Sequence, residues 1–270
     1  MILSGLMIFM VALKQYNQMT NLKFSVITAT FNRAVTIKRA LLSVKSQSYQ
    51  NIQITVVDGA STDETISEAK TILGNSDTII SEPDDGIYDA LNKGLEISTG
   101  DIISFLHSDD LFYDDDVISK VVDVFADDTV DVVYGDACFF SGQNSLEVRR
   151  RYRSSKLTLK NLAWGKMPAH PSIFIRRRIY DEIGHFETNF KIAADYEFLC
   201  RLVRYPNLKS VYLPYPFVRM QLGGASTGGL SSTILLNKEV LRAIRKNGIY
   251  TNLLMVLSKY PSKIMEYFFK

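Results

Sequence analysis

Short apolar runs alternate with segments of helical period along the first half of the chain. Runs of apolar and β-branched residues are typical of buried strands, whereas apolar residues that recur every three or four positions are typical of amphipathic helices. This alternation predicts βαβ units and a mostly parallel sheet flanked by helices, so we expect an α/β fold. The expected strands are residues 24–29, 52–57, 78–81, 101–106 and 130–134, and the expected helices are residues 35–46, 62–73, 87–97 and 117–125.

The second half is less regular, and it begins with a basic stretch. Arg149, Arg150, Arg151 and Arg153 lie close together there, and we interpret them as part of a mobile, solvated connection. The alternatives are contact with phosphates or with anionic lipid. Beyond this stretch we expect helices at residues 157–164 and 194–204, a strand at residues 172–176, and strands near Val211 and Phe217.

Both ends of the chain are rich in apolar residues. Residues 1–13 form an apolar run broken only by Ser4 and Gly5, which is well short of the roughly 20 residues that span a bilayer as a helix. This run is either a weak interfacial anchor or the product of an upstream mis-start, with Met19 as the true initiator. Residues 251–270 combine large apolar side chains with lysines, so they form either an interfacial helix pair split at Pro261 or a helix packed on the core.

Composition narrows the class of protein. The chain has 270 residues, 46% of them apolar, which is enough for one large domain with or without a small subdomain. Its 31 basic and 29 acidic residues nearly cancel, so the overall charge gives no reason to expect a nucleic-acid partner. Cys138 and Cys200 lie far apart and lack the spacing of a zinc site, which indicates a reducing, cytoplasmic setting.

Polar residues follow three of the predicted strands, at positions 30–33, 58–63 and 107–110. Ligands of α/β proteins bind beyond the carboxyl ends of the strands, so we expect these residues to meet at one rim. Asp109 and Asp110 would repel one another there unless a cation joined them. Mg²⁺ and Mn²⁺ prefer such oxygen ligands and keep open positions for substrate phosphates. The alternative is that either aspartate merely caps the next helix.

Seven segments between residues 23 and 227 occur in the order of a known family: "SVITATFNR", "VVDGASTDET", "SEPDDGIYDALNKG", "GDIISFLHSDD", "AHPSIFIRR", "AADYEFLCRL" and "GGAST". Together they resemble the GT-A glycosyltransferases of family 2. The third segment is most similar to the bacterial exopolysaccharide branch, which includes colanic-acid enzymes. The resemblance implies a Rossmann-like, mostly parallel central sheet with a C-terminal subdomain on the acceptor side.

The resemblance also assigns residues to the binding of a nucleotide-sugar donor. It implies that Asp58 hydrogen-bonds the base, where a carboxylate suits the N–H edge of uracil or guanine, although Asp58 could instead form an Asx turn. It implies that Asp109 binds Mn²⁺ or Mg²⁺, with Asp110 as a second ligand or a cap. His170 either supports the metal or the diphosphate or is structural. The other donor-binding residues that it implies are Thr30, Asn32, Arg33, Asp84, Asp85, Asn92 and Ser108.

Asp195 is the candidate catalytic base. It lies at the start of a predicted helix and matches the second acid of the family's Glu-Asp pair, with Ala194 in place of the glutamate. A helix N-terminus stabilises an ionised carboxylate, which keeps it available to accept a proton. The alternative is an N-cap aspartate with no catalytic role.

These inferences predict an inverting, metal-dependent glycosyltransferase that moves one sugar to a glycan or lipid-linked glycan acceptor in bacterial surface polysaccharide synthesis. A processive synthase would have a Gln-x-x-Arg-Trp motif, but Trp164 follows Ala163. The rival classes are a non-catalytic nucleotide-sugar-binding protein and a sugar nucleotidyltransferase. We expect a cytoplasmic protein, with peripheral contact to the inner membrane as an option. The expected parts are an apolar extension (1–20), a nucleotide-sugar-binding half (21–140), an acceptor and catalytic-base half (141–230) and a helical C-terminal segment (231–270).

Overall fold

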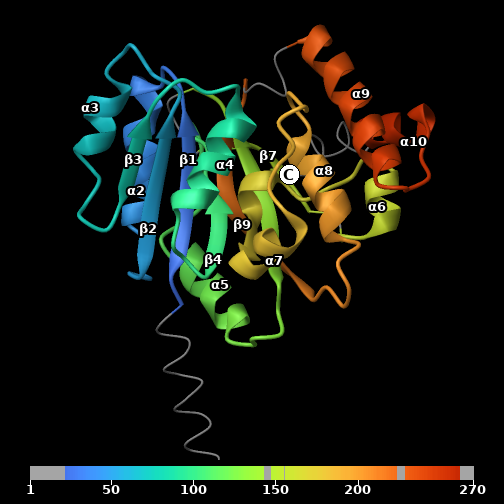
Figure 1. The fold of residues 1–270 in the computed structure, drawn as a ribbon, viewed down its shortest axis with the longest axis horizontal. Coiled ribbons are helices and arrows are strands. Elements are labelled where there is room, and N and C mark those ends of the chain that lie inside the picture. Colours follow the sequence, from blue (N-terminus) through green and yellow to red (C-terminus); the bar gives the residue numbers. More distant parts are fainter. Residues whose placement is uncertain (1–21, 143–146, 155, 224–228, 262–270) are drawn as a thin grey trace, which may run out of the picture.

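The computed structural model describes residues 22–142, 147–154, 156–223 and 229–261. Within these residues, one nine-stranded sheet runs through the molecule with helices on both faces (Figure 1). The strand order is β3-β2-β1-β4-β8-β6-β9-β5, and β7 pairs with β6. The apolar residues 1–20 and the tail 262–270 lie outside the described residues, as does most of the "GGAST" segment.

The first part of the sheet is parallel, as the sequence predicts. Its strands are β1 (Phe24–Thr30), β2 (Ile52–Asp58), β3 (Thr78–Ser81) and β4 (Ile102–Phe105). All seven residues of β1 are buried, which is typical of a parallel strand covered on both faces. Thr30 pairs in register with Asp58, and Asp58 pairs with Ser81, so these strands end at one level.

Helices cover both faces of the parallel strands. The helix α2 (Ala34–Lys45) buries Ile37, Leu41 and Val44 in a cluster with the apolar residues of one sheet face. The helix α4 (Ile87–Ile97) packs on the other face, where a Cβ atom at Gly94 would lie 2.4 Å from the Cγ2 atom of Ile27. This close approach packs α4 directly against β1 and β2. Two further helices of this half are α3 (Thr65–Lys70) and α5 (Val117–Phe125).

The second part of the sheet is mixed. The strand β8 (Ile173–Arg176) is antiparallel to both β4 and β6 (Val132–Phe140), whereas β9 (Ser210–Gln221) is parallel to β6. The short β5 (Leu111–Phe112) is antiparallel to β9. The remaining elements are β7 (Val148–Tyr152), α6 (Leu159–Ala163), a 3₁₀ turn (His170–Ser172), α7 (Arg177–Ile183), α8 (Ala194–Leu202), α9 (Leu230–Lys246) and α10 (Leu253–Leu257).

The interpretation of the arginine stretch as a mobile, solvated connection is wrong. Residues 148–152 form β7, which pairs with β6 in antiparallel register. Arg150 is buried with its guanidinium 4.3 Å from the centre of the Phe139 ring, and Arg151 forms an ion pair with the buried Asp136. Long arginine stems and aromatic faces pack well against each other, so three of the four arginines can belong to a strand, and only Arg153 lies beyond it.

The two strands expected near Val211 and Phe217 are one strand, β9. Pro214 and Pro216 lie inside it, and proline is usually a sign that a strand ends. The register between β9 and β6 shifts around Asp136, and this irregularity accommodates the prolines. The neighbouring strand in the sheet, β6, is also longer than expected, because it continues to Phe140.

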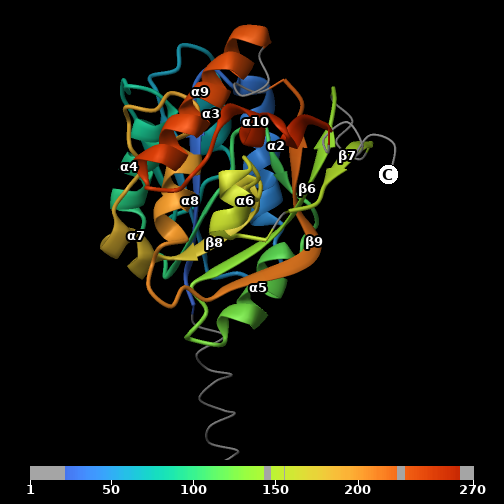
Figure 2. The same cartoon turned by 90° about the vertical axis from the view of Figure 1, so that its right-hand side faces the viewer.

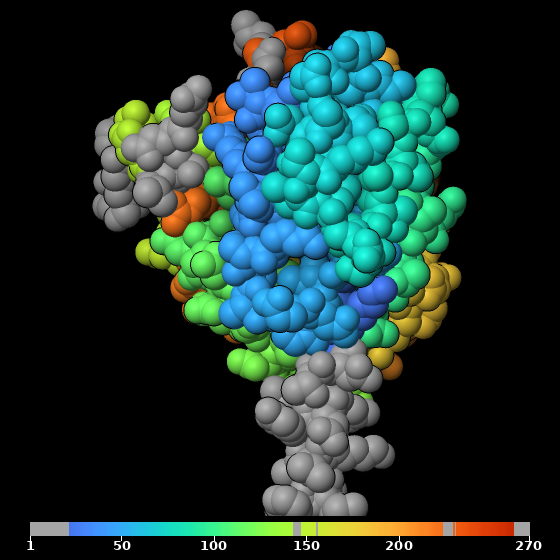
Figure 3. Space-filling view, turned by 90° about the vertical axis from the view of Figure 1, so that its left-hand side faces the viewer, coloured from blue at the N-terminus to red at the C-terminus, as the bar shows by residue number. Residues whose placement is uncertain are grey.

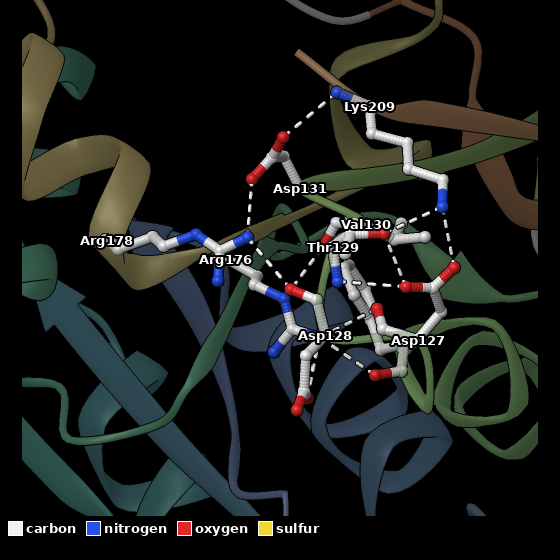
Figure 4. A network of polar contacts seen from close by, with 9 residues as sticks. Asp127, Asp128, Thr129, Val130, Asp131, Arg176, Arg178 and Lys209 are labelled. Atoms are coloured by element: carbon white, nitrogen blue, oxygen red, sulfur yellow. Dashed lines mark hydrogen bonds and ion pairs between the residues drawn. The ribbon is translucent and has the colours of Figure 1, made fainter. Parts of the chain in front are cut away.

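A polar network holds the edge of the sheet that lies away from the carboxyl ends of β1 and β4 (Figure 4). Asp131, which directly precedes β6, accepts hydrogen bonds from Arg178 (2.7 Å) and from the backbone of Lys209 (2.9 Å). Lys209 also forms an ion pair with Asp127, and this contact lowers the pKa of that carboxyl. The network joins β6, α7 and β9 where they begin, so it supports the sheet from the edge opposite the polar strand ends.

Candidate active site

A cavity of about 750 Å³ lies beyond the carboxyl ends of β1 and β4. A volume of this size is typical of small-molecule sites. The structure brings most of the predicted site residues to its wall: Thr30, Asn32, Arg33, Asp84, Ser108, Asp109, Asp110, His170 and Asp195. Asp58, Asp85 and Asn92 are not among the lining residues.

The loop after β1 is held by the loop after β2. Asn32 has φ of 50°, a left-handed conformation that asparagine tolerates better than most residues. Its side-chain oxygen accepts a hydrogen bond from the backbone of Thr62 (2.9 Å), and its own N–H donates to Ser61 (2.8 Å). The backbone of Arg33 donates to Thr65 (2.7 Å). These contacts leave Phe31 and the Arg33 side chain exposed at the cavity.

Asp58 lies behind this loop and not at the cavity. It is fully buried and accepts hydrogen bonds from the backbone of Ser61 (2.9 Å) and from the hydroxyl of Ser81 (2.6 Å). The Ser61 hydroxyl also donates to it. The side chain therefore forms the Asx turn that the sequence left open. Its contact with a nucleotide base stays a prediction.

The segment before α4 brings one of its two aspartates to the wall. Asp84 accepts a hydrogen bond from the backbone of Gly86 (2.9 Å), and Gly86 has φ of 114°, which favours glycine. Asp85 is exposed and does not line the cavity, and its backbone N–H donates a hydrogen bond to Asp89 (3.2 Å). Asn92 exchanges two hydrogen bonds with the backbone of Phe186 (2.9 and 3.0 Å). Asn92 thus ties α4 to the segment after α7, because its amide supplies both a donor and an acceptor.

Asp109 and Asp110 lie in the loop after β4, and we call this pair of residues the acidic edge. Asp110 is buried and accepts a hydrogen bond from the backbone of Gln221 (3.1 Å). Burial, and then the charge of Asp109, raise the pKa of Asp110 well above its usual range. Neither aspartate caps a helix, because β5 follows directly and the N-cap residue of α5 is Asp116. The alternative of a capping role is therefore wrong.

Two histidines stand beside the acidic edge. The ring centres of His107 and His170 are 5.9 Å apart, and His170 stacks on Phe105 at 4.9 Å. Burial lowers the pKa of both, that of His170 to about 3, so both imidazoles are neutral near pH 7. The Nδ1 atom of His107 is buried without a hydrogen-bond partner. A neutral ring with an unpaired nitrogen can bind a metal or accept a hydrogen bond from a ligand.

Asp109 and Asp110 fit a hard divalent cation that takes only some of its ligands from the protein. No group of three or more histidine, cysteine, aspartate or glutamate side chains in the described residues is arranged to hold a metal. Mg²⁺ and Mn²⁺ accept one or two carboxylates and take their other ligands from water and phosphates. Asp109 and Asp110, two adjacent carboxylates on the wall of a cavity, could supply that partial set.

Asp195 lies on the wall in the first turn of α8. The N-cap residue of α8 is Ala193, so Asp195 is not an N-cap aspartate. Its Oδ1 atom accepts hydrogen bonds from the backbone of Tyr196 (2.8 Å) and from the Tyr88 hydroxyl (3.1 Å). Burial raises the pKa of Asp195 to about 6 despite these bonds. Such a carboxylate is ionised at neutral pH and is also basic enough to accept a proton.

Glu239 of α9 supports the loop in front of Asp195, and sequence reasoning missed it. Its carboxylate accepts hydrogen bonds from three consecutive backbone N–H groups, those of Lys191 (2.9 Å), Ile192 (2.8 Å) and Ala193 (3.0 Å). The Tyr88 hydroxyl also donates to the carbonyl of Ile192 (2.7 Å). No local sequence signal links Glu239 to α8, because a whole strand and a loop separate them.

A further part of the cavity lining, which we call the apolar wall, is largely apolar, and it too was missed. It contains the Arg150–Phe139 stack together with side chains from β7, β9 and α9. The only signal in the sequence was the basic stretch, for which phosphate contact was an alternative. The other lining residues of this wall are Tyr152, Met167, Met220, Leu222 and Leu236.

Comparison with known proteins gives a consistent result. The sequence profile of Glycosyl transferase family 2 matches residues 25–184. A "PGL/p-HBAD biosynthesis glycosyltransferase" of Mycobacterium bovis is 30% identical over 226 residues, covering 82% of this chain and 83% of the relative. An uncharacterized glycosyltransferase of Mycobacterium tuberculosis is 33% identical over 181 residues, covering 66% of this chain and 67% of the relative.

Solved structures share the fold at lower identity. A mannosyltransferase of Pyrobaculum calidifontis in complex with GDP-Man and Mn²⁺ has a TM-score of 0.64 and 22% identity, covering 86% of this chain and 65% of that one. TarS of S. aureus in complex with UDP-GlcNAc has a TM-score of 0.62 and 19% identity, covering 85% of this chain and 67% of that one. The GT-A fold expected from the sequence is confirmed. The chain belongs to glycosyltransferase family 2.

Proposed function

We propose that this glycosyltransferase moves one sugar from a nucleotide-sugar donor to an acceptor hydroxyl with inversion at the anomeric carbon. The observation that carries the proposal is the shared cavity of Asp109 and Asp195, one beyond β4 and the other on α8. Solved structures of the same fold bind UDP-GlcNAc and GDP-Man, which supports a nucleotide sugar as the donor class.

In the proposed reaction, Asp195 accepts the proton of the acceptor hydroxyl as that oxygen attacks the anomeric carbon. A new carbon–oxygen bond forms on one face of the sugar while the bond to the diphosphate breaks on the other. The nucleoside diphosphate leaves with the bonding electrons, and a single displacement inverts the anomeric centre. A raised pKa near 6 suits Asp195 to this role, because a base works best with a pKa near the working pH.

Asp109 and Asp110 serve the leaving group in this proposal. A Mg²⁺ or Mn²⁺ ion held there would neutralise charge on the departing diphosphate, an effect generally worth several kcal/mol. Arg33 and Lys191, which also line the cavity, place positive charge near the same space. Asn32 and Phe31 fill the wall next to them and would orient the nucleoside.

We propose that the acceptor is a glycan or a lipid-linked glycan and that the enzyme acts in the synthesis of bacterial surface polysaccharide. The apolar wall around Phe139 and Tyr152 suits an acceptor with an apolar portion, and a relative at 30% identity is named for PGL/p-HBAD biosynthesis. Transfer is non-processive. The buried cysteines Cys138 and Cys200 are free, which supports a reducing compartment.

The test uses purified enzyme with radiolabelled nucleotide sugars and bacterial lipid extracts as acceptors. We expect Asp195→Asn to bind donor as wild type does. Transfer should fall by about a thousandfold or more, because loss of a general base has an effect of this size when the base acts together with other catalytic groups. We expect Asp109→Ala, and wild type in EDTA, to lose both tight donor binding and transfer. Full turnover in EDTA would contradict the metal role. Donor binding without any transfer by wild type would favour the rival class of a non-catalytic binding protein.

A further inference from the structure

The helices α6 and α10 form one continuous surface at the end of the molecule remote from β3. They lie side by side in both ribbon views (Figures 1 and 2), and the Thr251 hydroxyl donates to the carbonyl of Ala163 (2.7 Å). Gly165, with φ of 70°, lies so close that a Cβ atom there would be 3.1 Å from the carbonyl of Val256. We call this the α6/α10 surface.

Exposed apolar side chains concentrate on the α6/α10 surface. It carries six of the eleven exposed large apolar residues in the described part of the chain. The helix α10 buries Val256 completely but leaves Leu254 81% exposed, as is Tyr250 just before it. The helix α10 thus packs on the core with one side only, and because residues 262–270 lie outside the described residues, the helix pair split at Pro261 stays a prediction. The six residues are Leu159, Trp164, Tyr250, Leu253, Leu254 and Leu257.

The two segments that form this surface carry charges of one sign. Neither residues 148–180 nor residues 240–261 contain an aspartate or glutamate. Lys156, Lys160 and Arg245 are exposed among them, whereas Lys246 forms an ion pair with Glu187 from another segment. Apolar side chains bordered by lysine and arginine suit the boundary of a bilayer that carries anionic lipid, and tryptophan and tyrosine favour that depth.

The cavity adjoins this surface. Met167 and Pro168 line the cavity directly after α6, and Leu236 lines it from α9, which contacts α10. A membrane at the α6/α10 surface would therefore lie near the apolar wall. If the proposed function holds, a lipid-linked acceptor would enter from that side.

We propose that the α6/α10 surface docks the protein on a membrane containing anionic phospholipid. None of the helices in the described residues has the length and apolar character needed to cross a bilayer, so the proposed contact is with the membrane surface. Attachment combines insertion of the α10 leucines with attraction between the basic side chains and lipid phosphates. It does not require nucleotide sugar or catalytic activity.

The test is sedimentation of the full chain with vesicles of phosphatidylcholine, with and without phosphatidylglycerol. We expect binding that requires phosphatidylglycerol, weakens in high salt, and falls about tenfold or more in Leu253→Ser/Leu254→Ser, because interfacial affinity follows the apolar area inserted. The matched control is Val35→Ser/Leu42→Ser on α2, whose side chains are also exposed. The helix α2 belongs to the N-terminal half of the chain, whose face is shown in Figure 3. The control variant should bind vesicles as wild type does.

Three results would overturn the proposal. One is no sedimentation of wild type with either vesicle, and another is equal binding to both vesicles. The third is equal binding by the Leu253→Ser/Leu254→Ser variant and its control, which would place any membrane contact elsewhere, for example in residues 1–13. All substituted side chains are exposed, so circular dichroism should show an unchanged fold. The donor-binding assay is read separately, and its failure would leave this proposal standing.

Discussion

At the scale of single residues, two opposing effects set the basicity of Asp195. Withdrawal from solvent raises its pKa, whereas hydrogen bonds from Tyr196 and Tyr88 lower it. Desolvation is the larger effect, and the carboxyl titrates near pH 6. Below this pH the carboxyl is protonated and cannot accept a proton. Above it the carboxyl is ionised and can act as a base.

This balance predicts the pH dependence of transfer. In wild type, kcat/KM should fall as pH drops through about 6, because only the ionised carboxylate is a base. Tyr88→Phe removes a donor to that carboxylate, so the pKa should rise and the acid limb should move up by roughly one pH unit, as expected for a hydrogen bond to a charged group. Rates at saturating donor and limiting acceptor across pH 5–8 provide the measurement of kcat/KM for the acceptor. An acid limb that stays in place, or moves down, would contradict the role of Tyr88.

At the scale of elements, the parallel strands and their helices could be predicted from sequence, whereas the mixed half could be predicted only in part: β8 and α8 were expected, but β7 was not. A strand such as β1 is buried on both faces, so its sequence is continuously apolar and distinct from the helices around it. The strand β7 is only half-buried, and its arginines satisfy their charge through Asp136 and Phe139. These partners come from β6, so no local pattern in β7 reveals them.

The same difference explains which site residues were found. Asp109 and Arg33 lie in the loops that follow β4 and β1, where topology alone brings polar residues to a common rim. Asp195 required the family resemblance, because its neighbours Tyr88 and Glu239 lie on other helices. Asp58 and Asn92 were assigned to the donor, yet their hydrogen bonds are made to protein groups that only the folded chain supplies.

The contact between α9 and the loop before α8 predicts a phenotype for Glu239→Gln. A glutamine amide offers one oxygen where the carboxylate now accepts three N–H groups, and its NH₂ group would face a donor. We expect the loop to shift and kcat to fall by about ten- to a hundredfold, which is the effect of misplacing a catalytic group. The donor KM should rise by a smaller factor, because Lys191 lies on the same loop. Loss of the Glu239 charge should also lower the pKa of Asp195 and move the acid limb to lower pH.

Glu197→Gln is the matched control for this variant. Glu197 is also a buried carboxylate at α8, but it pairs with Arg201 and Asn247 and does not line the cavity. In both variants the free energy of unfolding should fall by about 1–3 kcal/mol, because buried hydrogen-bonding groups lose a partner. Urea unfolding measures this change. Only Glu239→Gln should change the pH profile. If the two variants had identical pH profiles of activity, the role of Glu239 would be purely structural.

At the scale of the whole molecule, one sheet joins the two sides of the cavity. The strand β8 pairs with β4 on one side and with β6 on the other, so the acidic edge after β4 and the apolar wall of β6 and β7 belong to one framework. The network around Asp131 and Lys209 secures the far edge of the same sheet. Ligand contacts made on both walls should therefore stabilise the whole described fold and not one half of it.

This coupling predicts a single, cooperative thermal shift on donor binding. With Mn²⁺ present, the cognate nucleotide sugar at a hundred times its Kd should add about 2.7 kcal/mol of stability. For a chain of this size, that corresponds to a rise in Tm of roughly 5–10 °C. A panel of UDP-, GDP- and dTDP-sugars read by calorimetry would identify the base, since only the cognate donor should give the full shift. Asp109→Ala should show little of it, because its diphosphate site would lack the metal. An equal shift in Asp109→Ala and wild type, or a transition that splits in two, would contradict a metal-dependent donor site shared by both walls of the cavity.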